Sequence, residues 1–211
     1  MTSEELPLPE TLGPREAAER LRAKAPELAR RADFAAPDYQ DEDGRTHVRW
    51  YGGPLSLPPG YSGPDPLVVD GDLAIDGFFF DGMSPATLIV VAGTLRARKL
   101  RTRGTILVGG DLIVDELVYA NSSNDFQLYV GGDVKTPVFV EEGMRCEIVG
   151  DLVVTHALSL QGSVTFAGGT RAVPRSRDAR GVLHPAILDA KGYPSLERVF
   201  EAMLEDEPLR P

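Results

Sequence analysis

Apolar residues alternate with other residues in five stretches of this chain, and each stretch is centred on a glycine. The phrases are LVVDGDLAID (67–76), IVVAGTLRAR (89–98), ILVGGDLIVD (106–115), LYVGGDVKTP (128–137) and CEIVGDLVVT (146–155). Their central glycines are Gly71, Gly93, Gly110, Gly132 and Gly150, so the spacings are 22, 17, 22 and 18 residues. A phrase that returns about every 20 residues is typical of a solenoid, whose repeats bury their apolar faces only by stacking.

Fixed offsets from each glycine indicate which side chains stack on one another. Apolar residues predominate four and two positions before the glycine and two and four positions after it. This period of two places one set of side chains inside and the other set outside a β-strand. A further apolar residue lies seven positions after each glycine, so the parity changes once, which indicates a corner between two strands. The residues at this offset are Phe78, Leu100, Leu117, Phe139 and Ala157.

The pattern predicts a mainly β fold, a single-stranded right-handed parallel β-helix of about five to six coils. Successive coils should stack about 4.8 Å apart, and each glycine fits a corner where a Cβ atom would clash. Variable coil length favours the right-handed form over the left-handed form, which is built on strict hexapeptides. A degenerate last coil is expected from Val164 to Val173. The alternative is an antiparallel β-sandwich, which does not explain one residue class at five equivalent offsets.

The flanking segments divide the chain into three regions. Residues 1–66 should form a helical and Pro-rich region, residues 67–174 the β-helix, and residues 175–211 a linker and a C-terminal helix. Pro14 and Pro26 can each stand in the first turn of a short helix.

The ends of the solenoid are expected to be capped, because a terminal coil exposes a strand edge and part of the core. Apolar residues follow Ser195 at helical spacing, and the end of the last coil is the nearest place to bury them. They are Leu196, Val199, Phe200, Met203 and Leu204. We therefore expect the C-terminal helix to cap the last coil and the Trp50–Tyr51 segment to cap the first.

Composition restricts the class of partner. The chain has 211 residues, a formal net charge of −10 and a pI of about 4.8. This charge argues against nucleic acid or an anionic membrane and suits a basic protein, although acidity also serves solubility alone. The single cysteine, Cys146, falls on an inward position and is interpreted as a core residue. No stretch resembles a signal peptide or a membrane span, so a cytoplasmic protein is expected.

The two coils of 22 residues carry surplus residues in the same part of the coil, at 81–85 and 121–125. Loops that project from a rigid scaffold are a common place for binding, while the alternative is that they are surface excursions without function. Phe78 is assigned to the core, and at least one of the next two phenylalanines should point outward. The candidate partner-binding residues are Phe79, Phe80, Met83, Ser84, Asn121, Ser122, Asn124 and Asp125.

Charged residues also recur at fixed offsets. Five basic residues lie between Arg96 and Arg103, and they form either a partner patch or part of a stacked charge ladder. Asp76, Arg98 and Asp115 each stand five positions after a glycine, which predicts an opposite-charge ladder on the outer face. Aspartates one position after the glycines are expected to bind turn backbone rather than calcium. These are Asp72, Asp111, Asp133 and Asp151, with Thr94 in the remaining coil.

The GDL phrase resembles the bactofilins, bacterial polymer-forming cytoskeletal proteins with a right-handed β-helix core. Four stretches also look like a set of bacterial GDL-repeat proteins, some of which neighbour secreted toxins and so imply immunity proteins. These stretches are Val68–Leu73, Val91–Leu100, Val108–Leu117 and Tyr119–Asp125. The resemblance covers about half of the chain and implies a fold, but it transfers no catalytic residue. The long N-terminal region and the expected capping helix depart from bactofilins and argue against a filament.

The sequence therefore predicts a non-enzymatic protein that binds a protein partner along a rigid face, for example as an immunity protein for a basic toxin. A monomer or small homo-oligomer is expected, with no cofactor or metal, because His47, His156 and His184 lack metal-ligand spacing. One alternative is a self-assembling scaffold of the bactofilin kind. The other is a carbohydrate-active enzyme that uses Asp76, Arg98 and Asp115.

Overall fold

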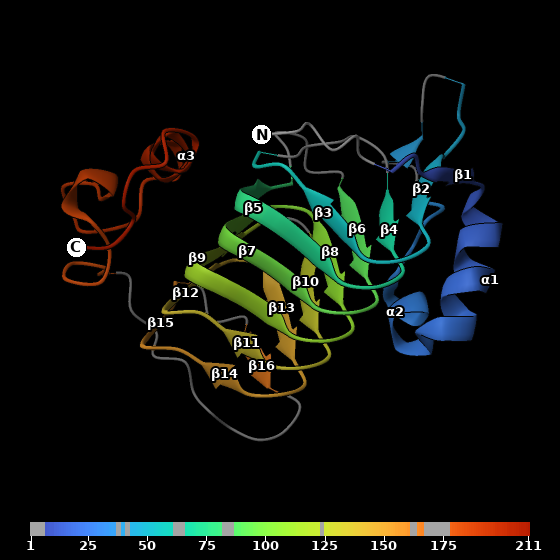
Figure 1. Cartoon of the computed structure of the whole chain (residues 1–211). Coiled ribbons are helices and arrows are strands. Elements are labelled where there is room, and N and C mark those ends of the chain that lie inside the picture. Colours follow the sequence, from blue (N-terminus) through green and yellow to red (C-terminus); the bar gives the residue numbers. More distant parts are fainter. Residues whose placement is uncertain are drawn as a thin grey trace.

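The computed structural model describes residues 7–36, 39–40, 43–60, 66–81, 87–122, 125–160, 164–166 and 178–211. Within them the chain forms a parallel β-solenoid of about six turns, followed by a C-terminal helix (Figure 1). The predicted mainly β fold with stacked parallel coils is confirmed.

One sheet contains the strands that precede the central glycines. In spatial order its strands are β1 (Glu10–Leu12), β2 (Val48–Tyr51), β4 (Leu67–Val69), β6 (Leu88–Val91), β8 (Thr105–Val108), β10 (Gln127–Val130), β13 (Arg145–Ile148) and β16 (Val164–Phe166). All neighbours pair in parallel except β1, which pairs antiparallel with β2. β16 is the first strand of the expected last coil, and the rest of that coil lies outside the described residues.

The second sheet contains the strands that follow the glycines. Its strands are β3 (Leu55–Leu57), β5 (Leu73–Phe80), β7 (Leu95–Thr102), β9 (Leu112–Asn121), β11 (Val134–Lys135) and β14 (Leu152–Val153), with β12 (Val138–Glu142) and β15 (His156–Ser159). β9 pairs with β11 through its first half and with β12 through its second half. The corner that the parity change predicts therefore divides this sheet into two outer faces.

The interior is a stacked apolar ladder that includes the predicted Leu100, Phe139 and Ala157. In the two long coils the inward residue is Phe79 or Val118, so the assignment of Phe78 and Leu117 to the interior is wrong. The cause is a one-residue β-bulge in each long coil, where two residues oppose the single residue Arg98 of β7.

Three of the corners combine a glycine with an aspartate beside it that bonds to the next coil. A Cβ atom on Gly132 would lie 2.8 Å from the carbonyl carbon of Gly110 and closer still to the carboxylate of Asp111. That carboxylate accepts a hydrogen bond of 2.9 Å from the N–H of Asp133 in the next coil. Asp72 and Asp133 accept equivalent bonds from the coils that follow them. The expected bonding of these aspartates to backbone is confirmed, and it connects successive coils.

The solenoid begins one coil earlier than expected. β2 and β3 pair in parallel with the first GDL coil, so the Trp50–Tyr51 segment is part of a coil rather than a cap. This coil lacks the GDL phrase but keeps Tyr51, Leu55 and Leu57 at three of the four alternating offsets around Gly53, with Arg49 at the fourth. The edge of β2 is covered by the antiparallel strand β1.

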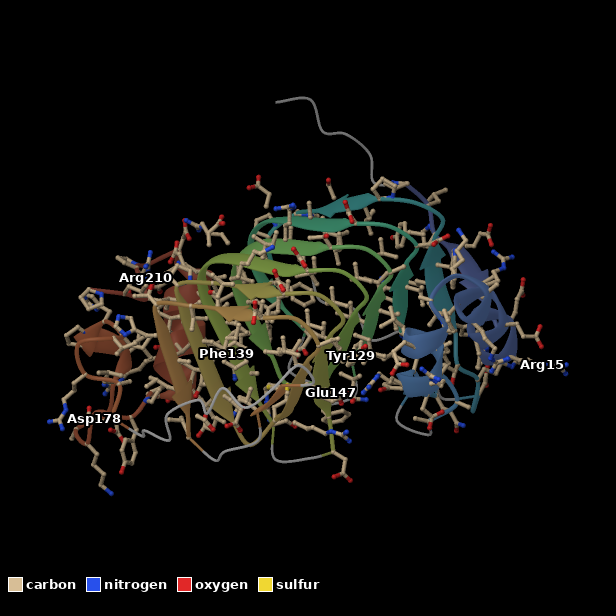
Figure 2. The ribbon with its side chains drawn as sticks, turned by 90° about the horizontal axis from the view of Figure 1, so that it is seen from below. Arg15, Tyr129, Phe139, Glu147, Asp178 and Arg210 are labelled. Atoms are coloured by element: carbon tan, nitrogen blue, oxygen red, sulfur yellow. The ribbon has the colours of Figure 1, made fainter. Side chains whose placement is uncertain are left out.

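Two N-terminal helices cover the outer face of the first sheet. They are α1 (Pro14–Lys24) and α2 (Pro26–Arg31), which begin at the predicted prolines. We call this surface the helix face; its outward residues are Trp50, Val68, Val90, Leu107 and Tyr129. The guanidinium of Arg31 lies 3.8 Å from the Tyr129 ring centroid. It also donates hydrogen bonds of 3.0 and 2.7 Å to Glu147, at the boundary between coils and helices (Figure 2).

The C-terminal segment, residues 178–211, lies beside the solenoid on the side away from α1 and α2 (Figure 1). It contains a 3₁₀ turn η2 (Pro185–Ile187) and α3 (Leu196–Leu204). We call the surface beneath it the tail face, formed by outward residues of β5, β7, β9, β12 and β15. Its apolar residues are Phe78, Phe80, Leu117, Tyr119, Val138, Val140 and Leu158. The expectation that α3 caps the last coil is therefore wrong. The helix instead packs against the side of the solenoid, where these outward residues bury its apolar side chains.

Replacing Gly132 by alanine should lower the free energy of unfolding by about 2–4 kcal/mol, because the added Cβ overlaps the preceding corner. Urea denaturation measures this change. Gly53→Ala is the matched control, since a Cβ atom there meets nothing within 4 Å and should change stability by less than about 0.5 kcal/mol. Equal losses in both variants would contradict the stacking argument.

Glu147→Gln should destabilise the docked helices by about 1–2 kcal/mol near neutral pH, because it breaks a partly buried bidentate pair. Arg31 holds the pKa of Glu147 below its ordinary value of 4.5. A lowered folded-state pKa stabilises the fold above the unfolded-state pKa, and this contribution disappears as the pH falls through the folded-state value. The difference between wild type and variant should therefore shrink below about pH 4.5. Urea titrations at several pH values measure it, and a gap that persists in acid would refute this account.

Candidate functional site

The chain covers two of its outer faces with its own flanking segments, whereas the described helices leave the remaining face uncovered. We call this remaining surface the open face. It is formed by β3, β11, β14 and the first halves of β5, β7 and β9. Its central row of outward residues is Ser56, Ala74, Arg96, Ile113, Lys135 and Val153. Val153 is 53% exposed.

A groove of about 950 Å³ lies on the open face, between its first coils and the C-terminal end of α3. Small residues such as Ser56, Ala74 and Gly77 leave the hollow, while Phe78 and Leu204 supply apolar walls. Gly77 has a φ of 115°, and a Cβ atom there would lie 2.9 Å from Pro59. The volume is that of a site for a small molecule or a short peptide segment.

The three residues of the expected charge ladder line this groove, but they do not pair as expected. Arg98 forms ion pairs with Asp206 of the C-terminal segment and with Glu116, the latter at 3.9 Å. Within the described part of the chain, Asp76 and Asp115 have no ion-pair partner, and both are exposed. The bulges explain the difference, because each places two residues opposite Arg98 and so changes the direction of the aspartate side chains.

Asp206 occupies a backbone position that normally favours glycine. Its φ is 58°, and Glu207 N–H donates to Ala202 O at 2.8 Å, as in a Schellman motif at the end of α3. A carboxylate at a helix C-terminus is also unfavourable with the helix dipole. Lys99 compensates, because its Nζ lies 3.3 Å from the Asp206 carboxylate and donates a bond of 2.6 Å to Glu207 O. Burial lowers the pKa of Lys99, whose side chain is 1% exposed.

The side chains of Phe79 and Phe80 are not available to a partner. Phe79 is 0% exposed in the interior, and Phe80 is 6% exposed because the ring of Phe200 covers it at 4.7 Å. The guanidinium of Arg101 lies 5.1 Å from the Phe80 ring and 5.3 Å from the Phe200 ring, at cation–π distance. The expectation that one of these phenylalanines is free for a partner is therefore wrong, because the C-terminal segment fills that place.

Both surplus segments begin with anchored residues. The buried carboxylate of Asp81 accepts hydrogen bonds of 3.0 and 2.8 Å from the N–H groups of Arg103 and Gly104, and burial raises its pKa. Asn121 donates to the Glu142 carboxylate at 3.0 Å, and Ser122 is 6% exposed. Of the remaining candidates, Asp125 is exposed. Met83, Ser84 and Asn124 lie outside the described residues.

The histidines, the cysteine and the acidic side chains of the described residues form no further candidate site. The described ranges contain no group of three or more His, Cys, Asp or Glu side chains arranged to hold a metal. His184 Nδ1 accepts a hydrogen bond of 3.3 Å from Ala186 N–H, at the start of η2. Cys146 is fully buried, which raises the pKa of its thiol, as the core interpretation predicts. None of the helices in the described part combines the length and apolar character that crossing a bilayer requires.

Comparison with protein-family models, with curated proteins and with solved structures finds no match to this chain. The functional argument therefore rests on the geometry of the groove. Sequence reasoning singled out Asp76, Arg98 and Asp115 but did not identify the walls. Phe78 had been assigned to the interior, and the position of Leu204 and Asp206 depends on contacts between residues about a hundred positions apart.

Proposed function

We propose that this chain is a non-catalytic protein that binds a protein partner on the open face. The observation that carries the proposal is the division of the outer surface. The chain covers the helix face and the tail face with its own segments, and its described residues leave one grooved face uncovered. Stacked coils fix the outward side chains in rows, so this face needs little ordering on binding, which favours affinity.

The mixture of side chains in the groove suits a protein partner. Phe78, Leu204 and Ile113 supply apolar contact area, and Asp76 and Asp115 supply charge at the rim. Interfaces commonly combine an apolar centre with charged residues that select the partner and speed the encounter.

The distribution of charge favours a basic partner. α1 and α2 together carry six basic and three acidic residues, and most of these charges pair with neighbours. In the C-terminal segment, by contrast, exposed acids have no ion-pair partner in the described ranges, and two of them flank Asp206 at the groove. These are Glu197, Glu201, Glu205 and Glu207. An immunity protein that neutralises a basic toxin in the cytoplasm is the concrete form of this proposal.

A groove variant tests the proposal against a charge-matched control. Wild-type bait, Asp76→Lys/Asp115→Lys and the control Glu19→Lys/Asp151→Lys, whose two acids are exposed and lie outside the groove, are used to capture proteins from the native host. A partner of the open face should bind wild type and the control but not the groove variant. The captured protein is then purified, and its Kd for the groove variant should rise about a hundredfold or more. Equal capture by all three baits would refute binding at this face.

The predicted binding loops remain a competing location. Their exchange has to begin after Asp81, because the Asp81 carboxylate is 2% exposed and holds the turn at Gly104. If the open face binds the partner, replacing residues 82–85 and 123–125 should leave capture unchanged. Loss of capture on loop exchange, with the groove variant unaffected, would move the site to the loops.

The alternative of a bactofilin-like scaffold meets an obstacle at the first coil. Filaments built by stacking coils need two free parallel edges, and the edge of β2 is already occupied by antiparallel β1. We expect light scattering on a sizing column to give a constant mass, near 22.8 kDa or twice that, over roughly a hundredfold range of concentration. Growth into large species with concentration would instead support the scaffold.

A further inference from the structure

We propose that the groove of the open face binds an extended basic segment of the partner, in which two Lys or Arg side chains three residues apart pair with Asp76 and Asp115. This inference rests on the proposed function and adds the chemistry and the spacing of the bound segment.

The spacing follows from the coils. Asp76 and Asp115 lie on the first and third GDL coils, with one coil between them, so their backbones are about 10 Å apart. In a polyproline II segment, side chains three residues apart lie on the same side at about 9 Å. A β-extended segment brings same-side residues to about 7 or 13 Å, which fits less well. The match favours basic residues at every third position.

The charge of the groove depends on where Arg98 is held. Arg98 stands between the two aspartates along the coils and would repel a cationic segment there. Its ion pairs with Asp206 and Glu116 neutralise it and draw it toward the C-terminal segment. Lys135 is the main cause of the lowered pKa of Asp111, to which Arg96, the remaining arginine of the groove, also contributes. Arg96 is exposed and forms no ion pair within the described residues. Within the described residues, the two carboxylates without an ion pair therefore outnumber the one groove arginine without an ion pair.

Asp206 is thus a positioning residue for the groove. Its left-handed backbone and its place at a helix C-terminus are both locally unfavourable for aspartate. Aspartate therefore stabilises the structure at this position through the contacts of its carboxylate. Those contacts are with Arg98 and Lys99 of β7. Asparagine tolerates the left-handed conformation, so Asp206→Asn removes the charge while keeping the backbone.

Apolar surface in the groove suits the residues between the two cations. Phe78 and Leu204 form one wall, and Leu204 is 51% exposed. Proline rings or aliphatic stems placed there would bury apolar area on both partners.

The probe is a labelled proline peptide with arginine at every third position, and its control is a peptide of the same composition with the arginines adjacent. Fluorescence anisotropy should show about tenfold tighter binding of the spaced peptide, weakening between about 50 and 300 mM salt. Asp76→Asn and Asp115→Asn should each reduce affinity for the spaced peptide about fivefold or more. The control variant Glu19→Gln/Asp151→Asn should leave affinity unchanged.

A double-mutant cycle separates positioning from simple rim charge. Arg98→Met should change peptide binding little, since the ion pairs already neutralise Arg98, whereas Asp206→Asn should weaken binding, since it frees the Arg98 charge. In the Arg98→Met background Asp206→Asn should have almost no further effect, because its action passes through Arg98. Equal effects of Asp206→Asn in both backgrounds would overturn the positioning role.

The remaining outcomes also decide the inference. Equal affinity for the two peptides, or equal losses in the control variant, would overturn the spacing, and the proposed function would survive if capture still depended on the groove variant. A doubled mass in light scattering that Asp76→Lys/Asp115→Lys returns to a monomer would make a second copy the occupant and overturn the partner segment. Equal capture of the partner by wild-type bait and by Asp76→Lys/Asp115→Lys would refute the proposed function itself.

Discussion

The stacking of glycine on glycine at each corner is the constraint on which the rest of the structure depends. At Gly93, Gly132 and Gly150 a Cβ atom would overlap the backbone of the preceding corner, so the coils can approach only where a side chain is absent. The neighbouring aspartates then bond to the backbone of the next coil. Together these contacts fix the register of every coil, and residues at one offset form a straight row along the solenoid. The outer surface therefore consists of rows of side chains, and the residues at each offset of the repeat determine the polarity and charge of each row.

The rows explain where the flanking segments lie. A row that is apolar and faces outward must be covered, and the helix face and the tail face both meet that requirement through segments distant in sequence. The row of the open face mixes small, charged and apolar residues. Covering it would bury little apolar area, and the described segments leave it uncovered. The solenoid is thus closed laterally on two sides, and its accessible chemistry is concentrated on the third.

Much of the fold followed from the sequence, because period-two alternation and fixed offsets report directly on side-chain direction. The assignment of Phe78 to the interior was wrong because the extra residues of a long coil are divided between a bulge and a loop. Counting residues along the sequence does not reveal how many belong to each. The cap assignment of α3 failed for another reason: an amphipathic helix indicates that a stripe is buried, not which surface buries it. A signal was nevertheless present, since the position three before each glycine is apolar at Val68, Val90, Leu107 and Tyr129. Those outward residues already required a lateral cover, which α1 and α2 provide, whereas the outward residues beneath α3 follow the bulges and have no fixed offset.

The basic run 96–103 shows why charge in a sequence does not translate directly into charge on a surface. Lys99 and Arg101 are buried beneath the C-terminal segment, and Arg98 pairs with Asp206, so the run mainly attaches that acidic segment to β7. The pairing uses up positive charge beside the groove and leaves the negative charge of Asp76 and Asp115 exposed. The property that a partner would recognise is therefore set in part by residues about a hundred positions away, since Leu204 and Asp206 of the C-terminal segment help to line the groove.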